Sequence, residues 1–117
     1  RRVLFRSRQY ATFPKLYQTY VRERHVLTLA QMIRRSTGAT ADMYRLKDRS
    51  YLRAGGFADV VVFDPVRYAP RADYVHPRET SVGVDALFVN GKLALRNGAA
   101  TGVAAGRALL RAKPAGC

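Results

Sequence analysis

The stretch that decides the fold is Ala58-Asp59-Val60-Val61-Val62-Phe63-Asp64-Pro65. Its four central residues are apolar and mostly β-branched, which favours an extended strand over a helix. The Asp64-Pro65 pair ends the run, because Asp-Pro favours a turn and proline cannot continue a central strand. We therefore expect a short buried strand here, followed by a turn.

A β-hairpin is expected on the C-terminal side of this strand. Val84–Val89 is a second apolar run, and Asn90-Gly91 joins it to Lys92–Arg96 as a two-residue turn. Both turn positions favour positive φ, as this hairpin type requires. The intervening stretch Tyr68–Thr80 contains prolines and charges of both signs, which indicates a long surface loop. Arg107–Leu110 is the expected position of a last edge strand.

The N-terminal half has helical periodicity instead. Apolar residues recur at i, i+3, i+4, i+7 and i+8 along one expected helix face, namely Phe13, Leu16, Tyr17, Tyr20 and Val21. We expect Thr12 to cap this helix and its aromatic face to pack, rather than to stack on nucleic-acid bases.

Two further helices are expected after it. Thr28-Leu29-Ala30-Gln31 is a capping box at the start of the second helix, with Leu27 and Met32 placed as a hydrophobic staple. Gly38 is expected to end that helix. A short third helix should run from Thr40 to about Leu46.

Composition leaves two function classes open. The 117 residues suit one domain, and 21 basic against 8 acidic residues give a net charge of +13. Such a charge is typical of a small basic nucleic-acid-binding module, which is the alternative function. Most of the basic residues are arginines, and high-GC genomes encode many arginines whether or not the protein binds a ligand. We therefore do not favour nucleic acid as the partner. No apolar run is long enough to span a membrane, so no membrane partner is expected.

The single cysteine indicates the cellular location, and the first seven residues indicate where the native sequence begins. Cys117 has no internal partner for a disulfide, which favours a reducing, cytoplasmic location. Arg1-Arg2-Val3-Leu4-Phe5-Arg6-Ser7 is the translation of AGA CGT GTG CTC TTC CGA TCT, a string that resembles the 3′ end of a common sequencing-library adapter. We interpret residues 1–7 as such an artefact and expect native sequence from Arg8 onward.

No catalytic residue and no metal site is predicted within the chain. His25 and His76 are 51 residues apart and lack the short spacings of zinc motifs. Asp59 and Asp64 flank the expected strand at odd spacing, so their side chains point to opposite faces and do not form a carboxylate pair. We expect them to make hydrogen bonds at the strand end and in the turn.

Seven segments carry a family resemblance: Tyr10–Lys15, Leu27–Leu29, Leu46–Arg49, Leu52–Gly55, Ala58–Pro65, Val89–Gly91 and Gly102–Arg107. They resemble, in order and at similar spacing, segments of the N-acyl-D-amino-acid deacylases (D-aminoacylases) of the amidohydrolase superfamily. The ADxVVFD and VNG segments are typical of the superfamily, whereas YxTFP followed by KDR narrows the resemblance to the deacylases. Ala11 and Ser50 stand where the family has glycine.

The resemblance implies an α+β fragment of a larger enzyme. Residues 8–53 would be the C-terminal helices of a metal-dependent (β/α)8 barrel, and residues 54–111 the C-terminal part of its small composite β-sandwich. Residues 112–117 would be a tail. A complete barrel takes about 250 residues, so we expect the missing N-terminal part of the same chain to be the fragment's main partner.

The resemblance also implies the chemistry. The family hydrolyses the amide C–N bond of N-acyl-D-amino acids, small-molecule substrates, with a bound zinc that activates water. The family's metal ligands and catalytic aspartate lie upstream of the matching region. This fragment is therefore expected to bind no zinc and to be inactive alone.

Arg8 is the one candidate substrate-binding residue, because an arginine of the family's HPR triplet occupies its position. Its guanidinium would hold the substrate carboxylate by charge-assisted hydrogen bonds; the alternative is a structural salt bridge. In the full-length enzyme, Arg8→Ala should raise KM more than it lowers kcat, as steady-state kinetics would measure. An unchanged KM with a lowered melting temperature would assign Arg8 to the scaffold.

Overall fold

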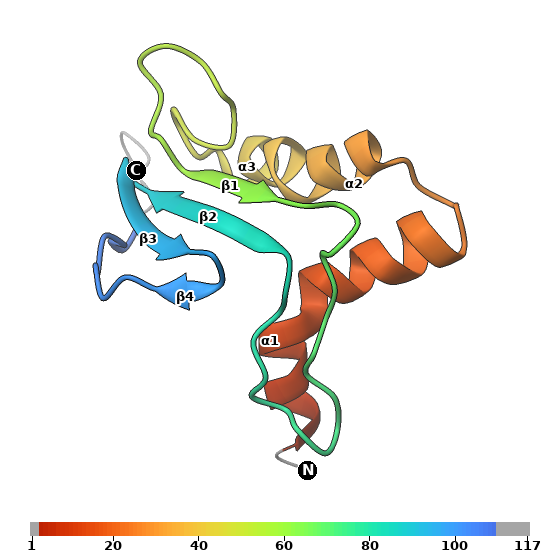
Figure 1. Ribbon diagram of the computed structural model, residues 1–117. Helices are drawn as coiled ribbons and strands as arrows, with labels where there is room; N and C mark the ends of the chain where they lie inside the picture. Colours follow the sequence, from red (N-terminus) through yellow and green to blue (C-terminus); the bar gives the residue numbers. More distant parts are fainter. Residues whose placement is uncertain (1–2, 110–117) are drawn as a thin grey trace, which may run out of the picture.

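The structure, a computed structural model, describes residues 3–109, with side chains from residue 10 onward. Within that range, helical segments come first and a four-stranded antiparallel sheet follows (Figure 1). The chain is thus of the α+β class, as predicted. No helix in the described part is long and apolar enough to cross a membrane.

The first helix is longer than predicted and changes type. Helix α1 (Val3–Leu16) continues directly into the π-helix η1 (Tyr17–Glu23). Thr12 therefore lies inside a helix, and its prediction as an N-cap is wrong. The π-helical hydrogen bonds run from i to i+5, so residues spaced for a 3.6-residue turn no longer share one face.

The predicted aromatic face is only partly packed. Tyr17 is buried, but Phe13 is 54% exposed and Tyr20 is 38% exposed. Tyr17 contacts Phe63 and Tyr68, with ring centroids 6.3 and 5.6 Å away. Its hydroxyl also donates a hydrogen bond of 2.8 Å to the carbonyl of Pro65. This cluster joins η1 to the end of the first strand.

The second helix has the predicted start but a different end. Helix α2 (Leu29–Ser36) opens with the capping box, in which Gln31 N–H donates to Thr28 Oγ1 at 3.2 Å and Thr28 N–H donates to Gln31 Oε1 at 2.9 Å. Gly38 does not end α2; it is the first residue of α3 (Gly38–Tyr44). A Cβ at Gly38 would lie 2.8 Å from the Tyr51 ring, so the small residue accommodates this ring.

The hairpin forms where it was predicted. The strands are β1 (Val60–Phe63), β2 (Val84–Val89), β3 (Lys92–Arg96) and β4 (Ala99–Ala100), hydrogen-bonded in that order. Asn90 and Gly91 both have positive φ, 49° and 77°, which confirms the two-residue turn between β2 and β3.

The C-terminal end differs from the prediction. Asn97-Gly98 ends β3, as the Asn-Gly pair predicts, and makes a second turn of the same kind into β4, a strand that the sequence did not predict. Arg107–Leu109 is not a strand, and Leu110 lies outside the described residues. The side chain of Thr101 donates a 2.7 Å hydrogen bond to Leu93 O and its backbone N–H donates to Ala94 O at 3.0 Å, so the chain stays beside β3 just after β4.

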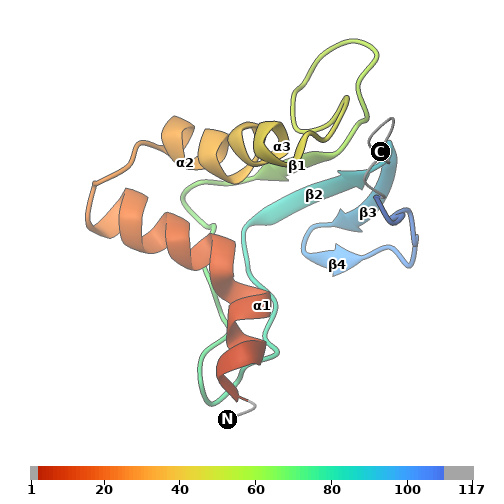
Figure 2. The same cartoon turned by 180° about the vertical axis from the view of Figure 1, so that it is seen from behind.

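The first strand is an edge strand and is not buried in this chain. Val61 and Val62 are 53% and 47% exposed, which contradicts the predicted buried strand. Among the described strands, β1 pairs only with β2, so its other edge is unpaired, and it forms one edge of the sheet in Figures 1 and 2. The loop Tyr68–Thr80 is long, as predicted, and runs beside α1, where Ser81 Oγ donates to Tyr10 O at 3.0 Å.

The chain as a whole is loosely packed. It exposes 9521 Å², whereas a compact monomer of 117 residues exposes roughly 6,400 Å². Its radius of gyration is 16.0 Å, against about 13 Å for a compact domain of this length. Among the described residues, the hydrophobic core consists of Ala11, Tyr17, Met32 and Ala41, whereas other apolar side chains such as Leu52, Val61 and Val62 are exposed and available for contact with other polypeptide.

Gly83, just before β2, tests the backbone packing of this sheet. It has φ +84°, and an added Cβ would lie 2.5 Å from the Tyr68 backbone nitrogen. We expect Gly83→Ala to lower the unfolding free energy by about 2–4 kcal/mol, from strain plus the clash. The control is Gly98→Ala, with a similar φ of +79° but open space around it, which should cost about 1 kcal/mol. Urea unfolding of the full-length protein measures both, and equal losses would contradict the backbone clash.

Candidate functional site

A cluster of hydrogen-bonded polar side chains lies at the tip of the β2–β3 hairpin. It consists of Arg49, Phe57, Asp59, Asn90 and Arg107, here called the Asn90 cluster. The first three precede β1, Asn90 is in the hairpin turn, and Arg107 follows β4. Four stretches with family resemblance therefore contribute to one place in the structure.

Asn90 is the centre of this cluster. Its backbone N–H donates to Asp59 Oδ1 at 2.8 Å, and its side-chain oxygen accepts from Arg49 at 2.7 Å. Its side-chain nitrogen donates to the carbonyl of Ala105 at 2.7 Å. The left-handed backbone of the turn, φ 49°, points both ends of the carboxamide at these partners. All three polar groups of Asn90 that face the cluster are satisfied.

Arg49 connects the carboxylate to the aromatic ring. It donates a hydrogen bond to Asp59 Oδ2 and pairs with it, and its side chain is only 10% exposed. Its guanidinium also lies 4.1 Å from the centre of the Phe57 ring, while that of Arg107 lies 4.9 Å from it. Two cations therefore contact one ring, an arrangement that stabilises by attraction to its π-electrons.

The electrostatics of the cluster keep Asp59 ionised. The pKa of Asp59 is lowered from its ordinary value, first by the hydrogen bond from the Asn90 backbone and then by Arg49 and Arg107. Partial burial opposes this shift but does not reverse it. A carboxylate so held is a poor proton acceptor near neutral pH. The cluster is thus suited to holding segments together rather than to acid–base catalysis.

The second predicted carboxylate, Asp64, has the expected turn role. Its Oδ1 accepts from the Val66 N–H at 2.8 Å, and its Oδ2 accepts from the Arg67 side chain at 2.6 Å. These bonds lower the pKa of Asp64, the Arg67 side chain having the largest effect. Asp59 and Asp64 do not meet, because they lie at opposite ends of β1, each with its own partners.

The other candidate residues are not brought together. His25 is exposed with φ 51°, and His76 lies in the surface loop, 3.6 Å from Asp73. Among residues 3–109, no three His, Cys, Asp or Glu side chains are placed to hold a metal ion. The backbone of Arg8 is in α1, but its side chain and Cys117 lie outside the described residues, so the role of Arg8 stays a prediction.

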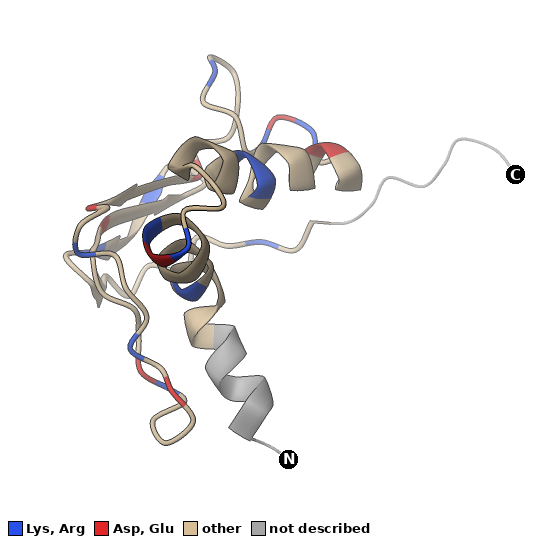
Figure 3. Cartoon of the chain, turned by 90° about the vertical axis from the view of Figure 1, so that its right-hand side faces the viewer, with Lys and Arg blue, Asp and Glu red and all other residues tan. Residues whose placement is uncertain are grey.

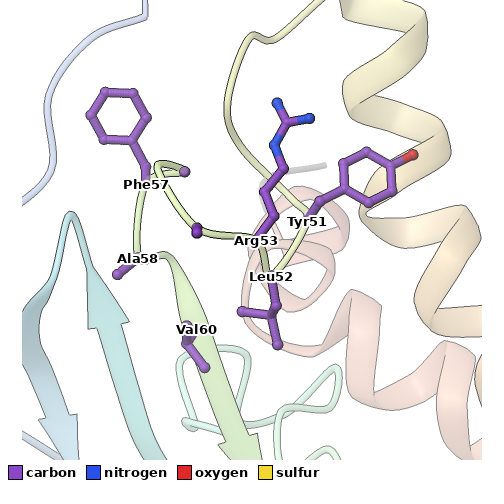
Figure 4. Close-up of a pocket in the computed structure, with 8 residues that line it drawn as sticks. Tyr51, Leu52, Arg53, Phe57, Ala58 and Val60 are labelled. Atoms are coloured by element: carbon purple, nitrogen blue, oxygen red, sulfur yellow. The ribbon is translucent and has the colours of Figure 1, made fainter.

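A surface pocket adjoins the cluster. It has a volume of about 300 Å³ and lies between the loop before β1 and β1 itself (Figure 4). Leu52, Phe57 and Val60 give it an apolar lining, and Arg53 is its charged residue. Arg53 is paired with Asp48 at 2.8 Å. Tyr51 also lines it, but its hydroxyl donates to Asp42 at 2.7 Å, so the pocket mainly offers apolar contact area.

The contribution of Asp59 to stability can be measured from the pH dependence of the unfolding free energy. Because its folded pKa is lowered, its contribution to stability is present above the unfolded value of about 4 and is lost as pH falls through the folded value. We expect Asp59→Asn to lower the unfolding free energy of the full-length protein by about 1–3 kcal/mol at pH 7. The difference from wild type should shrink steadily in acid, as denaturant titrations at several pH values would record.

The control is Asp48→Asn, which removes an exposed ion pair of the same loop. It should change stability by less than about 0.5 kcal/mol at every pH. An Asp59→Asn effect no larger than that of Asp48→Asn would contradict the assigned role.

Comparison with curated proteins identifies relatives. The chain is 39% identical over 104 residues to a D-aminoacylase of Alcaligenes xylosoxydans xylosoxydans, covering 89% of the chain and 22% of that protein. It is 40% identical over 85 residues to an N-acyl-D-aspartate deacylase of the same organism, covering 73% and 17%. The chain thus spans about a fifth of the length of these relatives. No protein-family model matches it.

Solved structures agree with these relatives. A D-aminoacylase crystal structure, described as defining a novel subset of amidohydrolases, superimposes with a TM-score of 0.84 at 35% identity, over 90% of this chain and 22% of that one. An N-acyl-D-glutamate deacylase of Bordetella bronchiseptica, complexed with zinc and a phosphonate inhibitor, gives a TM-score of 0.73 at 38% identity, over 75% and 19%. The chain is a homologue of the N-acyl-D-amino-acid deacylases of the amidohydrolase family and corresponds to a small part of them.

Proposed function

We propose that the chain is the C-terminal part of a metal-dependent hydrolase that cleaves the amide C–N bond of N-acyl-D-amino acids. The observation that carries the proposal is 39% identity to a D-aminoacylase, sustained over 89% of the chain. Identity over such a length, together with a TM-score of 0.84, supports the same fold and the same place in the larger enzyme.

The proposal includes an assignment of parts. Residues 8–53 would be the last helices of the (β/α)8 barrel, and residues 54–111 part of the small β-sandwich. Residues 1–7 would be the adapter artefact and residues 112–117 a tail. The order of helices before an antiparallel sheet supports this division. It also fits the length, since a complete barrel takes about 250 residues.

Metal and catalytic groups would come from the rest of the enzyme. A catalytic zinc needs about three protein ligands, and no such group exists among residues 3–109. The described residues therefore do not fit a zinc site. Zinc and the N-acyl-D-amino acid would be bound by the upstream part, for which the chain supplies support.

The missing upstream part is the proposed main partner of this chain. The excess of exposed surface supports it, as do the uncovered Val61 and Val62 on β1. Edge strands and exposed apolar faces are usually covered in complete domains. The proposal places the enzyme in the cytoplasm, with the single cysteine as support.

The alternative, a basic nucleic-acid-binding module, has less support. Basic side chains are spread over helices, loops and strands rather than gathered on one element (Figure 3). Tyr17, the central ring of the aromatic face, is buried and thus not available for stacking. The relatives are deacylases.

Activity measurements test the proposed function. The isolated 117-residue chain should neither hydrolyse N-acyl-D-amino acids nor hold zinc, whereas the protein from the complete reading frame should do both. Hydrolysis is measured by release of the free D-amino acid, and zinc by metal analysis of the purified proteins. Turnover or one bound zinc per isolated chain would refute the division of roles. An inactive, zinc-free complete protein would refute the proposed function.

A substitution in β1 tests whether the rest of the enzyme covers this strand. In the full-length protein, Val61→Asp should bury an unpaired charge and lower stability by about 3 kcal/mol or more. Val75→Asp is the control, because Val75 is 78% exposed at the tip of the surface loop. Thermal melts compare the two. Equal, small effects would mean that β1 stays open to solvent in the complete protein.

A further inference from the structure

The segment after β4 does not leave the sheet but turns back to the tip of the β2–β3 hairpin (Figure 1). Gly102–Arg107, here called the strap, has no regular secondary structure. It contacts the hairpin through the carbonyl of Ala105, which accepts from Asn90, and it contacts the loop before β1 through the Arg107 guanidinium on the Phe57 ring. Irregular segments so placed depend on side-chain contacts for their order.

We infer that the Asn90 carboxamide is a latch that holds the strap and the loop before β1 against the same hairpin tip. One side chain accepts from Arg49 on the loop and donates to Ala105 on the strap, at 2.7 Å each. The loop and the strap are coupled a second time, because Arg49 and Arg107 contact the same Phe57 ring. Loss of the carboxamide removes the hydrogen bond to Ala105 and one of the bonds that orient Arg49.

The latch is separate from the turn in which it sits. A two-residue hairpin turn needs positive φ at both positions, which Gly-Gly provides as well as Asn-Gly. Asn97-Gly98 is a turn of the same kind, with φ values of 50° and 79°. For the Asn97 side chain the structure gives no hydrogen bond comparable to those of Asn90. The chain thus contains a matched control for the same substitution.

Limited trypsin digestion of the protein from the complete reading frame tests the latch. Cleavage of a native protein follows the population of the locally open form when opening is fast. We expect Asn90→Gly to raise the cleavage rate of the Arg107–Ala108 bond about fivefold or more. Cleavage of Arg71–Ala72, in the exposed surface loop, should stay within about twofold of wild type as an internal reference. Mass spectrometry of the released fragments gives both rates.

Asn97→Gly should leave both rates at the wild-type level. Equal rates at Arg107–Ala108 in Asn90→Gly and Asn97→Gly would overturn the inference. If Asn90→Gly raises cleavage at every site because it unfolds, Asn90→Asp decides, since it keeps the size of the side chain and an oxygen that accepts from Arg49 but removes the N–H that donates to Ala105. Faster cleavage only at Arg107–Ala108 in Asn90→Asp supports the latch, and an unchanged rate there rejects it.

Discussion

The carboxylate of Asp59 joins the start of β1 to the tip of the β2–β3 hairpin. It accepts the Asn90 backbone N–H at 2.8 Å and pairs with Arg49, while Gly91 N–H donates to the Ala58 carbonyl at 2.9 Å. The residues entering β1 and the turn between β2 and β3 are therefore fixed side by side. This contact sets the register that pairs Val60 with Phe88. It also gives Asn90 its position, on which the strap depends.

A second contact joins the helices to this sheet. Tyr17 packs on Phe63 and Tyr68 and binds the Pro65 carbonyl, so η1 contacts the end of β1 away from the hairpin tip. The chain is thus held by two clusters at opposite ends of β1 rather than by one continuous core. The exposed faces between them are what a part of a larger enzyme would present to the remainder. Its length, about a fifth of its relatives, agrees with that interpretation.

Features with local causes were predictable from the sequence. The β2–β3 hairpin and the Thr28–Gln31 capping box match the prediction, because turn and cap chemistry act within a few residues. The predictions that were wrong depend on contacts between residues far apart in the sequence or on the extent of a helix. Thr12 is not an N-cap, because the residues before it are already helical. Gly38 is needed to make room for the Tyr51 ring rather than to end a helix. The apolar composition of β1 predicted burial, but no other element of the described chain covers its central side chains.

The sequence segments that form the Asn90 cluster were predictable, but their assembly into one site was not. The KDR, ADxVVFD and VNG segments were recognised separately, but nothing in a single sequence pairs Arg49 with Asn90 across 41 positions. Asp59 was expected to make strand-end hydrogen bonds, and it does. The cation contacts on Phe57 had no signal, since arginine is common throughout the chain.

Reconstitution from two polypeptides tests the central claim most directly. The chain and the upstream part of its reading frame would be co-expressed as separate polypeptides and purified through a tag on the chain. We predict that the two parts copurify in a 1:1 complex that holds zinc and deacylates N-acyl-D-amino acids. A chain that purifies alone as a stable, cooperatively unfolding monomer and leaves the upstream part unbound would contradict the account.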